Sequence, residues 1–312
     1  MTFMKNYKTP KQLEPGSTIG VIAPASAAKR KPTKLGLEYL EKRGYTLKTS
    51  THLTKGTKYL AADDKMRIKF LEDFLLDPEV DAIICVRGGY GMLRIIDKLD
   101  YEKISTVAPK ILVGYSDITA LQLSLLQKCG WVTYSGPMVA SEMGNKFSQF
   151  SENWLWNVLT KSNEKLNFQN PETDEIKIIN PGKADGNLIG GCLSLVTPLL
   201  NTEYMPPLDG NILFLEDVGE PGYKVDKMLQ TLKLHKVFDK ISGLVIGKFS
   251  GTFKKSDKKN FTLEQLLLDT IPNIDFPIIT DFAYGHIDQR FTIPVGGKFS
   301  MDTKKGEYTY LR

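Results

Sequence analysis

The first half of the chain alternates short apolar runs with amphipathic segments, and this alternation restricts the possible folds more than any other feature. Apolar runs that predict strands lie at 18–23, 45–49, 82–87, 111–114 and 131–134, and segments that predict helices lie at 33–43, 63–76, 92–97 and 117–128. Strands separated by helices pair in parallel, with helices on both faces of the sheet. The sequence therefore predicts an α/β protein whose N-terminal part is a doubly wound parallel sheet of the Rossmann or flavodoxin type.

A chain of 312 residues exceeds the usual size of a single core, so we expect two domains. We predict an N-terminal α/β domain at 1–145, a helical connector and polar linker at 146–183, and a C-terminal mixed α/β, strand-rich domain at 184–312. Within the last of these we expect strands at 211–215, 243–248 and 278–282, two helices, and short strands after 291.

Composition excludes several classes of function. The chain has 41 basic and 36 acidic residues, and its densest basic runs, 29–31 and 254–259, lack interleaved aromatics, which favours a solvated surface over a nucleic-acid site. No apolar run is long enough to span a membrane, and no apolar segment follows the N-terminus, so we expect a cytoplasmic protein. The three cysteines and three histidines show no metal-ligand spacing and no disulfide framework, so we expect neither a metal nor a cofactor.

One turn carries a serine in the setting of a catalytic nucleophile. The strand at 111–114 ends in Gly114, and Ser116 follows at the tip of the turn before the next helix. Hydrolases expose a nucleophilic serine on such a strand–turn–helix. The second glycine of the G-x-S-x-G pattern is absent, so a serine that only caps the helix is an equal alternative.

A serine nucleophile needs a base, and the chain has three histidines. His52 and His235 lie in polar stretches, where we expect surface residues. His286 follows the apolar run 276–280, at the end of an expected strand, where α/β enzymes place catalytic side chains. A histidine with a purely structural role in this loop is the alternative.

The base in turn needs an acid that orients it, and Glu216 is the candidate. It directly follows the expected strand at 211–215 and begins a cluster of three carboxylates with Asp217 and Glu220. For Asp217 and Glu220 we expect a solvated acidic turn.

Two backbone N–H groups are candidates for an oxyanion hole. Asp117 follows the serine, and Gly89 lies in the glycine-rich loop 87–91 after the strand at 82–86. A phosphate-binding loop is the competing interpretation, but the loop lacks both the G-x-G-x-x-G and the G-K-[ST] patterns.

In their order along the chain, these motifs resemble the LD-carboxypeptidases, the muramoyltetrapeptide carboxypeptidases of a serine peptidase family that also holds the microcin C self-immunity peptidases. The resemblance covers nearly the whole chain and rests on the segments 15–26, 77–80, 87–91, 114–117, 186–191, 215–220 and 284–286. It implies that the family's nucleophile is Ser116, its glutamate Glu216 and its histidine His286, with Asp117 and Gly89 as oxyanion donors.

The resemblance also implies the reaction: hydrolysis of the L–D amide bond that releases terminal D-Ala from a murein tetrapeptide during cell-wall peptide recycling, by a homodimer. A carboxypeptidase must bind a free carboxylate, for which Arg is well shaped, and Arg87 and Arg290 are candidates because they lie beside motif residues. Because the serine belongs to the first predicted domain and the other two triad residues to the second, the triad would assemble across a domain interface, and domain motion could gate it.

Three alternatives stay open. A microcin C-type self-immunity peptidase, which cleaves peptidyl or aminoacyl adenylate analogues, should carry an aromatic loop that stacks a nucleobase, whereas Trp154 and Trp156 lie in an expected helix and suit a core. A nucleotide-binding module would need the missing phosphate fingerprint. A non-catalytic ligand-binding protein is disfavoured because every residue type of the triad is present.

Overall fold

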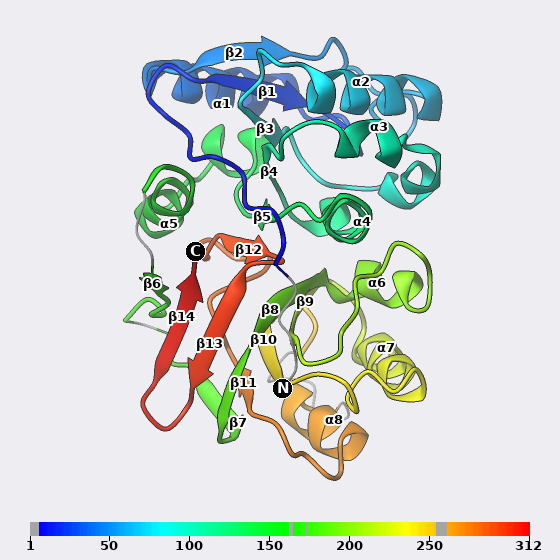
Figure 1. Ribbon diagram of the computed structural model, residues 1–312, viewed down its shortest axis with the longest axis vertical. Helices are drawn as coiled ribbons and strands as arrows, with labels where there is room; N and C mark the ends of the chain where they lie inside the picture. The colour runs from blue at the N-terminus through cyan, green and yellow to red at the C-terminus, as the bar shows by residue number, and fades with distance from the viewer. Residues whose placement is uncertain (1–5, 162–164, 173, 254–260) are drawn as a thin grey trace.

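The computed structural model describes residues 6–161, 165–172, 174–253 and 261–312. Over these residues the chain forms two β-sheets, one above the other in Figure 1, with helices packed around them. The basic run at 254–259 lies outside the described residues. Within the described ranges, no helix combines the length and the apolar character that a membrane crossing requires.

The upper sheet in Figure 1 has the strand order β12-β5-β4-β3-β1-β2. Its strands are β1 (Thr18–Ile22), β2 (Thr46–Thr49), β3 (Ala82–Cys85), β4 (Ile111–Gly114), β5 (Thr133–Ser135) and β12 (Ile293–Val295). The first five pair in parallel, in the 2-1-3-4-5 order of flavodoxin-like doubly wound folds. The predicted fold class is confirmed.

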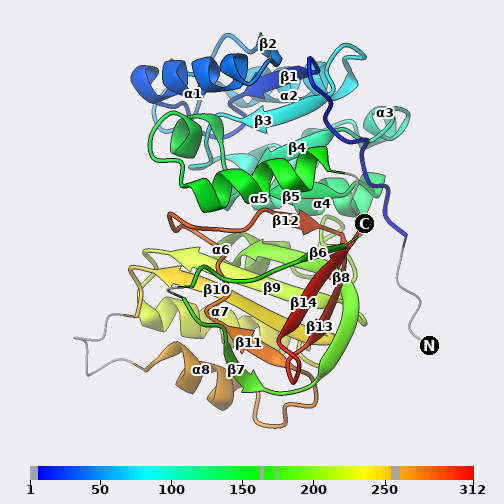
Figure 2. The same ribbon diagram turned by 90° about the vertical axis from the view of Figure 1, so that its left-hand side faces the viewer.

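Alternate side chains of the central strands enter two separate cores. In β3, Ile83 and Cys85 belong to one core, whereas Ala82 and Ile84 belong to the other. Successive residues of a strand point to opposite faces, so both faces are covered. Helices α2 (Asp64–Leu76), α3 (Tyr101–Ser105) and α4 (Thr119–Cys129) contribute to the first core, and α1 (Arg30–Lys42) and α5 (Gln149–Thr160), on the near side in Figure 2, contribute to the second.

The lower sheet has the order β6-β14-β13-β8-β9-β10-β11-β7. Its strands are β6 (Lys165–Asn167), β7 (Lys177–Asn180), β8 (Lys183–Cys192), β9 (Ile212–Val218), β10 (Gly243–Ser250), β11 (Ile278–Thr280), β13 (Lys298–Asp302) and β14 (Glu307–Leu311). The four central strands β8 to β11 are parallel, and the outer strands pair antiparallel. Helices α6 (Leu193–Val196), α7 (Gly222–Leu234) and α8 (Leu263–Thr270) complete this half, which is mixed and strand-rich as expected.

Two features differ from the expectation. The stretch 162–183, which we expected to be a loop, holds the edge strands β6 and β7; their side chains are mostly exposed, so no apolar alternation predicts them. Strand β12 returns to the upper sheet and pairs antiparallel with β5. The segment after 184 therefore contributes to both sheets, and the linear division at 145 and 184 stays a prediction.

The lower sheet and helix α4 of the upper half approach each other closely at Gly191, on β8. Its φ is +141°, and a Cβ there would lie 2.6 Å from both Cγ2 and Oγ1 of Thr119. Thr119 is fully buried at the start of α4, and its hydroxyl accepts a hydrogen bond from the backbone N–H of Cys192 at 3.2 Å. Because residue 191 has no side chain, the hydrogen bond between Cys192 and Thr119 can join the two halves.

We predict that Gly191→Ala lowers the free energy of unfolding by about 2–4 kcal/mol, because it adds backbone strain and overpacks a buried contact. Urea unfolding followed by circular dichroism measures this change. Gly306→Ala is the matched control: Gly306 also has a positive φ, +67°, but a Cβ there meets nothing within 4 Å. Equal losses in the two variants would contradict the close approach at Gly191.

Candidate active site

The serine turn and the glycine-rich loop meet at the carboxyl ends of neighbouring parallel strands. Strand β3 leads into the loop and β4 into the turn, and the two strands are paired. A Cβ on Gly88 would lie 3.1 Å from Cβ of Ser116 and 3.4 Å from the backbone N of Asp117. The loop and the turn are therefore in contact.

Ser116 has a φ of +65°, in the left-handed region. A residue other than glycine adopts this conformation at a cost of about 1–3 kcal/mol, and such residues concentrate at active sites. The N-cap of the short helix η3 (Ser116–Ile118) is Tyr115, without a side-chain capping bond. The half-buried Ser116 thus lies at the tip of a strained turn and is not the N-cap residue that the alternative interpretation expected.

The side chain of Asp117 ties the turn to the glycine-rich loop. Its Oδ2 accepts a hydrogen bond from the backbone N–H of Met92 at 2.9 Å. Burial raises the pKa of this carboxyl, against the lowering effect of the backbone donors at Met92 and Gly91. The side chain is thus engaged on the loop, while the backbone N–H lies beside Gly88.

Ser26, to which the sequence assigned no role, fixes the conformation of the glycine-rich loop. Its hydroxyl donates to the carbonyl of Tyr59 at 2.6 Å and accepts from the backbone N–H of Tyr90 at 3.1 Å. Gly89 has a φ of +113°, and a Cβ there would lie 2.4 Å from Oγ of Ser26, so only glycine fits. The pairing of β1 with β3 brings Ser26 to the loop. The order of the strands in the sheet, which was not predicted from the sequence, is the signal that could have found it.

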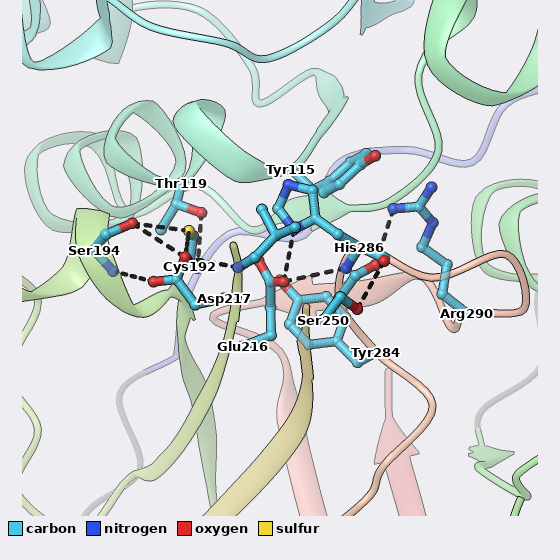
Figure 3. A network of polar contacts seen from close by, with 12 residues as sticks. Tyr115, Thr119, Cys192, Ser194, Glu216, Asp217, Ser250, Tyr284, His286 and Arg290 are labelled. Carbon is cyan, nitrogen blue, oxygen red and sulfur yellow. Dashed lines mark hydrogen bonds and ion pairs between the residues drawn. The ribbon is translucent and has the colours of Figure 1, made fainter. Parts of the chain in front are cut away.

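Glu216 and His286 form a hydrogen-bonded pair in the lower half (Figure 3). Glu216 lies on β9 with no exposed surface, and its Oε2 is 2.8 Å from Nδ1 of His286 and 3.2 Å from the backbone N of His286. An ionised carboxylate only accepts hydrogen bonds, so Nδ1 of His286 is the donor in this pair. The histidine loop follows β11, and the hydroxyl of Ser250 on β10 donates to the His286 carbonyl at 2.9 Å.

Tyr115 connects this pair to the serine turn. Its ring lies edge-on to the ring of His286, with centroids 4.9 Å apart and an interplanar angle of 64°. Tyr115 directly precedes Ser116 in the chain. The contact therefore brings the histidine of the lower half next to the serine turn of the upper half.

The two candidate arginines have different surroundings. Arg87 is exposed, and its Nη2 lies 3.5 Å from the position that a Cβ on Gly89 would take. Arg290 is 3% exposed, and its guanidinium contacts Glu142 and the carbonyl of Gly285. Burial acts to lower the pKa of Arg290, but Glu142 and Tyr115 outweigh it and the net shift is upward. Arg290 is thus a buried charge that is already paired inside the protein, and its expected role at the substrate carboxylate stays a prediction.

Asp217 also differs from the expectation, because it is buried rather than solvated. It is 2% exposed, and its carboxylate accepts hydrogen bonds from the backbone N–H groups of Ser194 and Val218, each at 2.8 Å. Burial raises the pKa of Asp217 and also that of the neighbouring Cys192 thiol (Figure 3). Asp217 therefore anchors the start of α6 and does not contact His286 through any hydrogen bond found among the described residues.

The remaining candidates of other chemistries are not part of this site. His52 bonds to Thr51 and His235 to Asn201, and neither bond involves a residue of the serine turn. All three cysteines are buried and free, and burial raises the pKa of the Cys85 thiol, which opposes a thiolate nucleophile there. Across the described part of the chain, no group of His, Cys, Asp and Glu side chains has the arrangement of a metal site.

Comparison with known proteins identifies relatives over nearly the full length of the chain. The N-terminal domain model of the LD-carboxypeptidases matches residues 19–136, and their C-terminal domain model matches residues 185–301. A Bacillus subtilis protein named "Probable murein peptide carboxypeptidase" is 37% identical, over 96% of this chain and 93% of its own. The microcin C7 self-immunity protein MccF of Escherichia coli is 28% identical, over 92% of this chain and 91% of its own.

Solved structures of the same two kinds share the fold. A muramoyltetrapeptide carboxypeptidase from Oxalobacter formigenes superposes with a TM-score of 0.82 at 27% identity and covers 94% of this chain and 98% of its own. Wild-type MccF without ligand superposes with a TM-score of 0.91 at 25% identity and covers 99% of both chains. With both domain models matched in order and a relative 37% identical over nearly its whole length, the chain belongs to the LD-carboxypeptidase family of peptidases.

Proposed function

We propose that this protein is a serine LD-carboxypeptidase that releases terminal D-Ala from murein tetrapeptides, with Ser116, His286 and Glu216 as its catalytic triad. The observation that carries the proposal is the Glu216–His286 hydrogen bond, packed through Tyr115 against a turn that holds Ser116 at a positive φ. An oriented histidine beside a strained serine is the arrangement that acyl transfer needs.

In the proposed reaction, Nε2 of His286 takes the proton of the Ser116 hydroxyl as its oxygen attacks the carbonyl of the scissile amide. Glu216 holds the imidazole in the required tautomer and stabilises the imidazolium. The N–H groups of Gly89 and Asp117 stabilise the oxyanion. His286 then protonates the departing amine of D-Ala, and a water molecule activated by the same histidine hydrolyses the acyl-enzyme.

Two observations support a murein peptide over an adenylate analogue as the substrate. The relative named for murein peptides is 37% identical to this chain, against 28% for MccF. Trp154 stacks on Phe168 with centroids 4.8 Å apart, and Trp156 stacks on Tyr45 at 5.3 Å, so both tryptophans are engaged inside the protein rather than free to stack a nucleobase.

The proposed substrate has a free C-terminal carboxylate, and we assign its recognition to Arg87. Its exposed guanidinium lies beside the glycine-rich loop that would hold the oxyanion. A role in recycling implies a cytoplasmic location, and the resemblance to the family implies a homodimer. Cell fractionation and light scattering of the purified protein test these two predictions.

The first prediction concerns the reaction itself. Wild-type protein incubated with murein tetrapeptide should release one D-Ala per peptide, and Ser116→Ala should release none above background, as measured by mass spectrometry. Equal release by both proteins would exclude Ser116 as the nucleophile. Release from an aminoacyl-adenylate analogue but not from the tetrapeptide would favour the self-immunity function.

The second prediction concerns the acid of the triad. Glu216→Gln should lower kcat by about 10²–10⁴-fold, because an amide no longer fixes the tautomer or stabilises the imidazolium. Asp217→Asn is the matched control, since this neighbouring buried carboxylate bonds to Ser194 and Val218 instead. Steady-state kinetics per folded protein should show the control within a few-fold of wild type, and similar losses in both variants would count against the role of Glu216.

The third prediction concerns the substrate carboxylate. Arg87→Met should raise KM for the tetrapeptide about 10- to 100-fold, the loss expected for a hydrogen bond to a charged group, and should not affect the peptide with an amidated C-terminus. Arg94→Met is the control, because Arg94 is similarly exposed but pairs with Asp64. An unchanged KM in Arg87→Met would place carboxylate recognition elsewhere.

A further inference from the structure

A buried ion pair joins the two halves of the protein behind the proposed triad. Glu142 lies in the π-helical turn η4 (Val139–Met143) after β5, and Arg290 lies between the histidine loop and β12. Glu142 is 7% exposed and Arg290 3% exposed, and Nη2 of Arg290 bonds to Oε1 of Glu142. Turns of π-helix occur frequently at functional sites, and a pair so deeply buried needs a reason other than solubility.

Each member of the pair is fixed by further contacts. The second carboxylate oxygen of Glu142 accepts the backbone N–H of Met138 at 2.7 Å. On the other side, Nη1 of Arg290 donates to the carbonyl of Gly285 at 3.0 Å, and the backbone N–H of Arg290 donates to Ser151 at 2.8 Å. Arg290 thus holds the residue that directly precedes His286 (Figure 3).

Tyr115 lies between this pair and the triad. Its hydroxyl donates to Oε1 of Glu142 at 2.9 Å, and the guanidinium carbon of Arg290 lies 4.0 Å from the centroid of its ring. The same ring contacts the ring of His286, with centroids 4.9 Å apart. The side chain of Tyr115, which directly precedes Ser116, therefore contacts a carboxylate, a guanidinium and the proposed base at once.

We propose that Glu142, Arg290 and Tyr115 form a positioning network that sets the location of His286 relative to Ser116 across the interface between the two sheets. The inference rests on the proposed function. The pair fixes both residues between which the proton must move. Arg290 holds the backbone at Gly285, which precedes the base His286, and Glu142 holds the side chain of Tyr115, which precedes the nucleophile Ser116. None of the three residues takes part in bond making.

The geometry distinguishes a positioning role from two simpler ones: binding of the substrate carboxylate by Arg290, and an ion pair that only stabilises the fold. A carboxylate-binding Arg290 would need an uncompensated guanidinium, but its charge is met by Glu142. A pair that only stabilises the fold would not need to contact the backbone beside the base and the ring beside the nucleophile at once. Since a misplacement of about 1 Å can cost on the order of 10²-fold in rate, such contacts have direct consequences for kcat.

The test uses full-length protein and follows both peptide hydrolysis and the rate at which a fluorophosphonate probe labels Ser116. Arg290→Met should lower kcat and the labelling rate by about 10²-fold, with KM within about threefold of wild type, because the network positions the triad without touching the peptide. Arg290→Lys should recover part of the rate, since the cation remains but one ammonium lacks the fork that reaches Glu142 and Gly285 together.

Two comparisons make the network itself testable. The double variant Glu142→Gln/Arg290→Met should lose no more activity than Arg290→Met alone, because residues that act as a unit are not additive. Tyr115→Phe, which keeps the ring, should retain more activity than Tyr115→Leu, which removes the contact with His286. Additive losses in the double variant would overturn the proposal.

Leu232→Ala in α7 is the control for stability, because it makes a cavity at a fully buried position outside this network. Leu232→Ala should keep the wild-type kcat per folded protein even where its loss in Tm equals that of Arg290→Met. Arg290→Met should lose kcat. A raised KM with unchanged kcat in Arg290→Met, or a labelling rate equal to that of wild type, would overturn the proposal. Because labelling needs no peptide, a wild type that is labelled but releases no D-Ala would instead count against the proposed substrate.

Discussion

The proposed active centre depends on the packing of the two sheets against each other, because neither half contains the complete set of residues. The upper half provides the serine turn and the glycine-rich loop, and the lower half provides the Glu216–His286 pair. The buried contacts that join them include Ser135 with Tyr284 at 2.7 Å and Cys192 with Thr119 at 3.2 Å. Strand β12 adds a covalent return from the lower half into the upper sheet. Relative domain motion is the usual expectation where a domain interface is small and polar. The buried contacts here favour a fixed geometry at the site instead of gating by such motion.

The sequence predicted the five parallel strands of the upper sheet and indicated the segments that carry the candidate site residues, because these depend on local patterns. Strand β4 is a fully buried apolar run, and a turn that follows such a strand at the carboxyl edge of a parallel sheet is a place for reactive side chains. Glu216 and His286 were found in the same way, as polar residues at the ends of buried strands. In each case the physical signal lies within about ten residues of the chain, the range over which pattern reasoning is informative.

The parts that the sequence did not predict depend on contacts between distant residues. Edge strands β6 and β7 expose most of their side chains, so their pairing partners rather than their own composition define them. Burial of Asp217 could not be read from an acidic turn, because the donor that satisfies it, Ser194, comes from a different element. The compensation of Arg290 by Glu142 spans 148 positions in the chain. The sequence shows that Arg290 carries a positive charge, but it does not show which carboxylate pairs with that charge in the fold.

Arg87 and Arg290 illustrate how surroundings divide one residue type between two roles in the proposed reaction. A substrate carboxylate gives up hydration when it binds, so it gains most from a cation that is not already neutralised. Arg290 has exchanged its hydration for Glu142, Gly285 and the face of Tyr115, and its charge produces little net field at the site. Arg87 keeps its exposure beside the glycine-rich loop. If Arg87 binds the carboxylate of the departing D-Ala, the leaving group and the scissile carbonyl both lie at the glycine-rich loop, because the oxyanion is proposed to bind Gly89 of the same loop.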